Sequence, residues 1–175
     1  KIKNMSKDSS EYVRTCCIQC YYNLSRDIVS REKMVAAHSV PVIIKISLDK
    51  ISVAMAKVSS KTLKSLCGDL SITNYLVKEG IMRAFNSLVE VDDNPTRQFV
   101  AEGLCTLFQS KKEVLKKLIE QGAVGLIVQL SAFSNSATTG EWCSYALLHL
   151  SSSNLCPPIM IAQGILPCLI DLCED

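Results

Sequence analysis

Three cysteines near the amino terminus have the type and spacing that could support metal or redox chemistry. Cys17 and Cys20 form a C-x-x-C pair, and Cys16 precedes it. A structural zinc site needs four ligands, and the sequence contains neither a second C-x-x-C nor a pair of closely spaced histidines. Within one helix these cysteines would lie on the apolar side. We therefore expect them to pack in a core and to hold no metal.

The remaining reactive side chains do not form a catalytic pattern. His38 and His149 are the two histidines, one in a predicted turn and the other on a predicted helix. The sequence contains no Ser/His/Asp set, no glycine-rich phosphate loop and no H-E-x-x-H motif. The chain is therefore predicted not to be an enzyme and to need no cofactor.

Composition indicates an all-helical chain in a reducing compartment. Of the 175 residues, 48% are hydrophobic, which is ample for a packed core, whereas 7 Gly and 5 Pro are too few for a β-sandwich or barrel. The nine cysteines are an odd number scattered along helical stretches, unlike a disulfide framework. Cys17 and Cys143 occupy equivalent places where a small apolar residue would fit between helices. We expect the cytosol or the nucleus.

Charge is distributed unevenly along the chain. Residues 1–70 contain 12 Lys and Arg against 6 Asp and Glu, and residues 71–175 contain 7 against 11. This gradient could orient a partner, or it could reflect solvated helix faces that differ by chance. The overall net charge of +2 is too small to predict nucleic-acid binding. Apolar runs are shorter than the roughly 18 residues that span a membrane, so no membrane insertion is expected.

A fixed 42-residue step relates positions along the whole chain. His38, Gly80, Gly122 and Gly164 each follow a short apolar run and precede a longer one. Leu24, Leu66, Phe108 and Leu150 keep the same step and close another amphipathic stretch. A constant period of this length is typical of solenoids, in which stacked units share a core that no single unit could build.

Each repeated unit is predicted to contain three helices. The first helices are expected at 30–37, 72–79, 111–121 and 156–163, and the second helices end near Ser47, Val89, Ser131 and Cys173. The third helices are expected at 11–24, 53–66, 96–108 and 141–150, with Asn94 capping the one that Pro95 begins. Between the first and second helix, Gly provides the positive φ of a sharp turn, and His tolerates it.

This pattern resembles the armadillo repeat of catenins and importin-α-type carriers. The residues that carry the resemblance are the pairs Glu79-Gly80, Gln121-Gly122 and Gln163-Gly164, the helices GAVGLIVQL and GILPCLIDL, and the endings CYYNLS and YALLHLS. It extends from about Ser9 to Cys173 and implies an all-α right-handed superhelix. HEAT repeats are the near alternative, but their units have two helices. The predicted units are 1–25, 26–67, 68–109, 110–151 and a partial 152–175, and we expect residues after Asp175 to supply the missing third helix.

The resemblance also implies where a partner would bind. Third helices of armadillo proteins line a concave groove, where importin-type members use a Trp and, four residues later, an Asn to hold a peptide backbone. The Trp places here contain Gln19, Lys61, Gly103 and Tyr145, and the Asn places contain Asn23, Ser65, Leu107 and His149. The ladder is therefore absent. The expected groove residues are Thr15, Gln19, Tyr22, Asn23, Arg26, Lys57, Lys61, Lys64, Ser65, Phe99, Gly103, Leu107, Glu141, Tyr145 and His149.

These residues suggest a protein or peptide partner. Lys57, Lys61 and Lys64 share one helix side and would suit an acidic peptide or helix, although they could equally form a solvated face. Leu107 is expected to be exposed, which favours a partner on this row. We expect a scaffold or adaptor, in a cytoskeletal or ciliary assembly by analogy with other solenoids. The alternatives are a cargo adaptor of the nuclear-transport class and a myosin-directed chaperone module.

Overall fold

The computed structural model describes residues 10–49, 52–133, 136–153 and 156–174, and these residues form an all-α solenoid. Residues 1–9 of the predicted first unit, with Ser9, lie outside this range. The described helices, in chain order, are α2 (Glu11–Ser25), α3 (Ile28–Ala36), α4 (Val40–Leu48), α5 (Val53–Cys67), α6 (Thr73–Glu79), α7 (Ile81–Val89), α8 (Asn94–Phe108), α9 (Lys112–Glu120), α10 (Ala123–Ala132), α11 (Ala137–Ser151), α12 (Pro157–Ala162) and α13 (Ile165–Glu174). The prediction of an all-α array with three helices per unit is confirmed, and the third helix of each complete unit is the longest.

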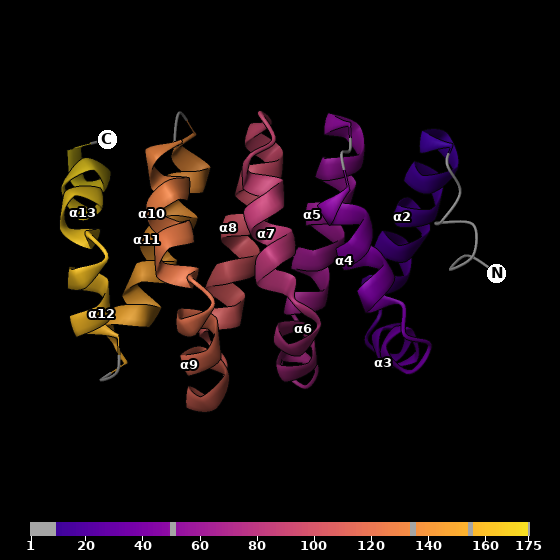
Figure 1. Ribbon diagram of the computed structural model, residues 1–175, viewed down its shortest axis with the longest axis horizontal. Helices are drawn as coiled ribbons and strands as arrows, with labels where there is room; N and C mark the ends of the chain where they lie inside the picture. The colour runs from indigo at the N-terminus through magenta and orange to yellow at the C-terminus, as the bar shows by residue number, and fades with distance from the viewer. Residues whose placement is uncertain (1–9, 50–51, 134–135, 154–155, 175) are drawn as a thin grey trace.

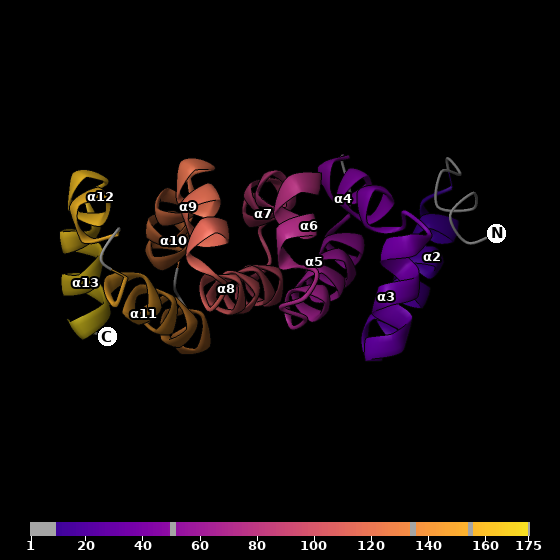
Figure 2. The ribbon, with the colours of Figure 1, turned by 90° about the horizontal axis from the view of Figure 1, so that it is seen from below.

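The helices are arranged in rows that run along the molecule. Among the long helices, α2 packs against α5, α5 against α8, and α8 against α11, whereas α4 packs against α7 and α10 against α13. Figure 1 shows the units side by side along the long axis. Figure 2 shows α5, α8 and α11 along one side of the array and α4, α7 and α10 along the other. One face of the array is therefore built from long helices.

A continuous core lies between these rows. Ile43, Leu63, Phe85, Leu104 and Ile127 have no exposed surface, and they come from the second and third helices of neighbouring units, α4, α5, α7, α8 and α10. Burying a side chain of this size stabilises the fold by about 1.5–3 kcal/mol relative to leaving it in water. Each unit contributes only part of this core, so a unit depends on its neighbours for stability.

The turn between the first and second helix of each unit has the predicted left-handed backbone. Gly80, Gly122 and Gly164 have φ of 96°, 87° and 78°, and His38 has φ of 51°. Gly80 follows α6, Gly122 follows α9, Gly164 follows α12 and His38 follows α3. Each of them lies just before the second helix of its unit. The 42-residue step in the sequence is therefore the spacing between these turns along the chain.

Alanine substitutions at two glycines of the same unit are expected to change stability in opposite directions. A Cβ at Gly122 or at Gly125 would meet no atom within 4 Å, so packing does not distinguish the two positions. Gly122 has positive φ, and alanine there should lower the free energy of unfolding by about 1 kcal/mol. Gly125 lies within α10, and alanine there should raise it by about 0.5–1 kcal/mol. Urea unfolding of both variants measures this, and equal shifts would contradict the backbone explanation.

Two predicted helix starts are wrong. Asp93, not Asn94, caps α8, because its Oδ2 accepts hydrogen bonds from the Thr96 backbone N at 2.9 Å and the Thr96 Oγ1 at 2.6 Å. Helix α11 begins at Ala137 rather than at Glu141. Its first turn contains Thr139, which is 2% exposed, so tertiary burial extends the helix beyond its apolar sequence pattern.

Candidate functional site

The long helices do not keep the 42-residue step of the turns. Each has 15 residues, and their first residues are Glu11, Val53, Asn94 and Ala137, which gives steps of 42, 41 and 43. The shift is already present in α7, which begins at Ile81 and ends at Val89, each one residue before the place that α4 (Val40–Leu48) predicts. A fixed step therefore misplaces the residues of α8 by one position and leaves those of α2, α5 and α11 aligned.

This shift removes two expected groove residues from the surface. Leu107 has no exposed area, so the prediction that it is exposed is wrong. Gly103 is also buried, and a Cβ there would lie 2.8 Å from Phe85 Cζ and 3.6 Å from Lys64 Cα. These two residues face the preceding helices. Gly103 allows α8 to approach α5 closely, which is a packing role.

The row that replaces them passes through Glu102 and Thr106. We use the name third-helix face for the aligned positions of the four long helices, which in chain order are Thr15, Gln19, Asn23 and Arg26; Lys57, Lys61, Ser65 and Gly68; Gln98, Glu102, Thr106 and Gln109; and Glu141, Tyr145, His149 and Ser152. Hydrogen bonds connect members of this row. Gln19 Nε2 donates to Asn23 Oδ1 at 3.3 Å, and Gln109 Nε2 lies 3.4 Å from His149 Nε2.

The other expected groove residues are accessible to different degrees. Gln19, Asn23, Arg26, Lys57 and Glu141 are exposed, and Tyr145 is 55% exposed. Partly buried positions are occupied by Thr15, Tyr22, Lys61, Lys64, Ser65, Phe99 and His149. The face therefore offers polar and aromatic side chains from all four long helices.

The three lysines of α5 have different surroundings. Lys61 Nζ lies 4.5 Å from the centre of the Tyr22 ring and 5.9 Å from that of Phe99, so it is held between aromatic rings of α2 and α8. Lys64 Nζ pairs with Glu102 Oε2 at 2.5 Å. Lys57 is exposed. Lys57 and Lys61 are therefore the lysines of this cluster whose charge a partner could meet directly.

Glu102 is the functional candidate that the fixed-step alignment missed. Its side chain is 9% exposed, and its Oε1 accepts a hydrogen bond from Gln98 Nε2 at 2.9 Å. The Lys64 ammonium compensates its charge from the neighbouring helix, so Glu102 connects α8 to α5 across the face. The sequence contained a weak signal, because Gln98 and Glu102 stand four residues apart.

The exposure of Cys16 and Cys20 corrects another expectation. Cys17 is 4% exposed and packs as predicted, but Cys16 and Cys20 lie at the surface. The reason is seen at Gly103, which is the residue of α8 that corresponds to Cys20 of α2. Gly103 is covered by the preceding long helix, which it contacts at Lys64. No long helix precedes α2 among the described residues, so Cys20 has no such neighbour. Leu24, one turn further on, is 40% exposed.

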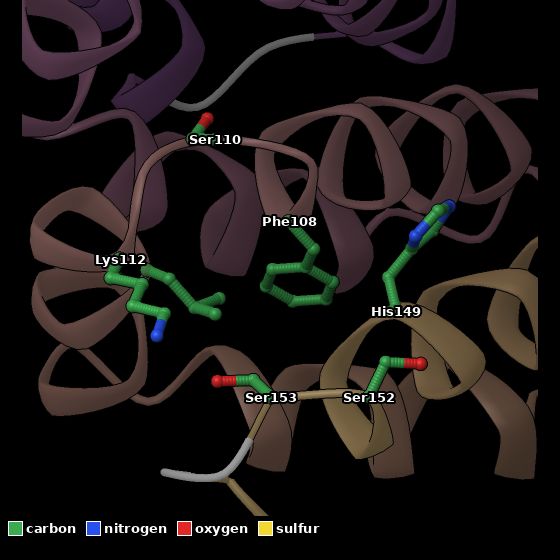
Figure 3. A pocket seen from close by; sticks show the side chains of 7 residues that line it. Phe108, Ser110, Lys112, His149, Ser152 and Ser153 are labelled. Atoms are coloured by element: carbon green, nitrogen blue, oxygen red, sulfur yellow. The ribbon is translucent and has the colours of Figure 1, made fainter.

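A cavity lies where the third-helix face meets α9 (Figure 3). It has a volume of about 250 Å³ and is lined by Phe108, Ser110, Lys112, Leu115, His149, Ser152 and Ser153. Figure 3 shows the Phe108 ring between Lys112 and His149, with Ser152 and Ser153 beside it. Its lining combines the apolar Phe108 and Leu115 with the polar side chains of three serines, Lys112 and His149.

The described ranges also bear on metal binding and on membrane insertion. No group of three or more His, Cys, Asp or Glu side chains there is close enough to hold a metal ion. Trp142 is partly buried against the core, with its ring 6.0 Å from the Tyr145 ring of the same helix. Each described helix is too short or too polar to span a lipid bilayer.

Comparison with known proteins supports the fold. No family model and no curated protein matches the chain. Among solved structures, it is similar to a designed armadillo repeat protein in complex with the peptide (KR)4, at 18% identity and a TM-score of 0.85, covering 97% of this chain and 71% of that one. It is also similar to computationally designed armadillo repeat proteins for modular peptide recognition, at 17% identity and a TM-score of 0.88, covering 99% and 74%. At these identities the likeness shows the fold alone.

Proposed function

Because the chain has an armadillo-like repeat fold, we propose that it is a non-enzymatic scaffold that binds a peptide segment of a protein partner along the third-helix face. The observation that carries this proposal is the row of accessible polar and aromatic side chains that four long helices bring to one side. Two of its structural neighbours are designed repeat proteins described as peptide binders. The neighbours are repeat scaffolds rather than enzymes, and the site contains no arrangement suited to catalysis.

The charges of the face favour an acidic peptide. Arg26, Lys57 and Lys61 lie on α2 and α5 and are exposed or partly exposed, whereas Glu102 is already paired with Lys64. One structural neighbour binds the basic peptide (KR)4. We expect the opposite preference here, because a basic peptide would meet these cations and be repelled.

The two alternative functions lack the side chains that they need. A carrier of basic signals would use a ladder of Trp and Asn, but the aligned Trp places contain Gln19, Lys61, Glu102 and Tyr145. A myosin-directed chaperone would need an extended apolar groove. With Leu107 buried, Tyr145 remains as the large apolar group of the face, and the partly buried Phe99 follows Gln98 of the face in the sequence.

The cellular setting is a further part of the proposal. Nine free thiols suit the reducing conditions of the cytosol or the nucleus. A cytoskeletal or ciliary assembly is the setting that we propose, by analogy with other solenoids that have structural roles.

The test is binding of two labelled octapeptides, (DE)4 and (KR)4, measured by fluorescence anisotropy. We expect the chain to bind (DE)4 more tightly, and the double variant Lys57→Glu/Lys61→Glu to weaken that binding by about tenfold or more, because two attractive contacts become repulsive. The matched control is Lys111→Glu/Lys116→Glu, which reverses two exposed lysines outside the face. If both double variants lost the same amount of affinity for (DE)4, the peptide could not be assigned to the third-helix face.

A further inference from the structure

A second cavity, at the opposite end of the third-helix face, has cationic walls. It lies between the ends of α2 and α5, next to α3, and has a volume of about 260 Å³. Arg31, Lys61 and Lys64 line it, together with Tyr22, Ser65 and Gly68. Three cations from two helices around one small space form the densest positive charge on this face. We call it the Arg31 cavity.

The Arg31 guanidinium is held in place by the end of α2. Its Nε donates a hydrogen bond to the Ser25 carbonyl oxygen at 2.5 Å, and Ser65 Oγ donates to the same oxygen at 2.9 Å. One terminal amino group lies beside Gly68, where a Cβ would be 3.9 Å from it. The bond through Nε fixes the orientation of the planar group and leaves its terminal amino groups, which are the donors that suit an oxyanion, beside the cavity.

The charges around this cavity match a dianion better than a monoanion. Glu102 neutralises Lys64, which leaves one positive charge on Arg31 and one on Lys61. Asp27 precedes α3 and stands four residues before Arg31, but it is fully exposed and accepts a hydrogen bond from the Ser30 N at 2.8 Å. Hydrogen bonding to Ser30 and, to a smaller extent, the charge of Arg31 lower the Asp27 pKa. A phosphate monoester carries about −1.5 to −2 at pH 7, whereas a carboxylate carries a single charge. Phosphate is therefore the group that would balance both cations.

The same crevice elsewhere in the array lacks this charge. Leu115, His149 and Ser152 stand 84 residues, or two turn steps, after Arg31, Ser65 and Gly68, and all three line the cavity of Figure 3. With leucine at the place of Arg31, that cavity has Lys112 as the lysine or arginine among its lining residues, whereas Arg31, Lys61 and Lys64 line the Arg31 cavity. The fold thus forms the crevice repeatedly, and the side chains of the Arg31 cavity give it its charge.

We propose that the Arg31 cavity binds the phosphate group of a phosphoserine or phosphothreonine in the partner peptide. The inference rests on the proposed function, because the peptide lies on the third-helix face and places its phosphorylated side chain at one end of that face. Phosphorylation of the partner would then control its binding to this chain.

The experiment uses three degenerate peptide pools that differ only in a central residue, which is phosphoserine, serine or glutamate. Each pool is passed over the immobilised chain, and the retained peptides are quantified by mass spectrometry. We expect the phosphoserine pool to be retained about tenfold more than either other pool, because two cations meet a dianion. Arg31→Leu copies the leucine of the equivalent crevice and should remove this preference while the serine pool is retained as before. Lys45→Gln, on the exposed side of α4, is the control and should keep the preference.

Each other outcome overturns the inference in a distinguishable way. Equal retention of the serine and phosphoserine pools, both lost in Lys57→Glu/Lys61→Glu, would leave the proposed function standing without a phosphate site. Equal retention of the glutamate and phosphoserine pools would mean that any anion is accepted. Orthophosphate could change the chemical shifts of the Arg31 side chain while the chain shows no preference for the phosphoserine pool. That result would assign the cavity to free phosphate. Failure to retain any pool would end both proposals.

Discussion

Replacing Leu107 with alanine is expected to lower the free energy of unfolding by about 2–5 kcal/mol. Leu107 has no exposed surface, so the truncation removes buried methyl groups and leaves a cavity that its neighbours can fill only in part. Urea unfolding followed by circular dichroism measures the loss. A decrease of this size would destabilise the array far more than an ordinary surface substitution.

The control for this prediction is the adjacent residue. Thr106 is partly exposed on the third-helix face, and its hydroxyl donates to the Glu102 carbonyl within the same helix at 3.0 Å. Alanine at Thr106 should change stability by less than about 1 kcal/mol. The opposite result would be an unchanged free energy of unfolding in Leu107→Ala and a lowered one in Thr106→Ala. It would show that α8 follows the fixed 42-residue step.

Cysteine reactivity in the folded chain is expected to differ by at least about a hundredfold between two groups of thiols. Burial raises the pKa of the Cys143 thiol to about 12, and it also raises the pKa of Cys67 well above its usual range. The thiolate is the form that reacts, so at pH 8 these cysteines should react mainly after the structure opens. Cys16, Cys20 and Cys173 are exposed and should react directly.

Alkylation with iodoacetamide at pH 8, followed by mass spectrometry of each cysteine peptide, measures these rates. In high urea all nine thiols should react at similar rates, which provides the reference. Labelling of Cys143 as fast as Cys16 in the folded chain would contradict its burial. Protection of Cys20 would instead indicate that another molecule or segment covers that side of α2.

Turns and helix types were predictable because they depend on local chemistry. A sharp turn needs a residue that tolerates positive φ, and this requirement placed Gly80, Gly122 and Gly164, with His38, at the turns before any contact was considered. Amphipathic runs between these turns then predicted the order of three helices per unit. The armadillo-like fold followed from the number and order of these elements.

The position of α8 in its row could not be predicted in this way. Helix α7 begins and ends one residue early relative to α4, and the 42-residue step is regained by the next turn, so the glycine spacing carries no trace of the shift. A one-residue shift rotates each side chain of a helix by about 100° around its axis, which placed Thr106 in the row instead of Leu107, and the largely buried Glu102 instead of Gly103. Pairing of Glu102 with Lys64 likewise depends on two helices about forty residues apart.

The amino-acid sequence by itself thus determined the solenoid, its turns and its three-helix units, because each depends on the conformational limits and apolar spacing of neighbouring residues. Tertiary structure alone decided which side of α8 faces outward. That choice is made by close packing, since α8 can approach α5 only where Gly103 leaves room against Phe85 and Lys64. The composition of the third-helix face, and the charge of the Arg31 cavity at its end, follow from that contact between helices.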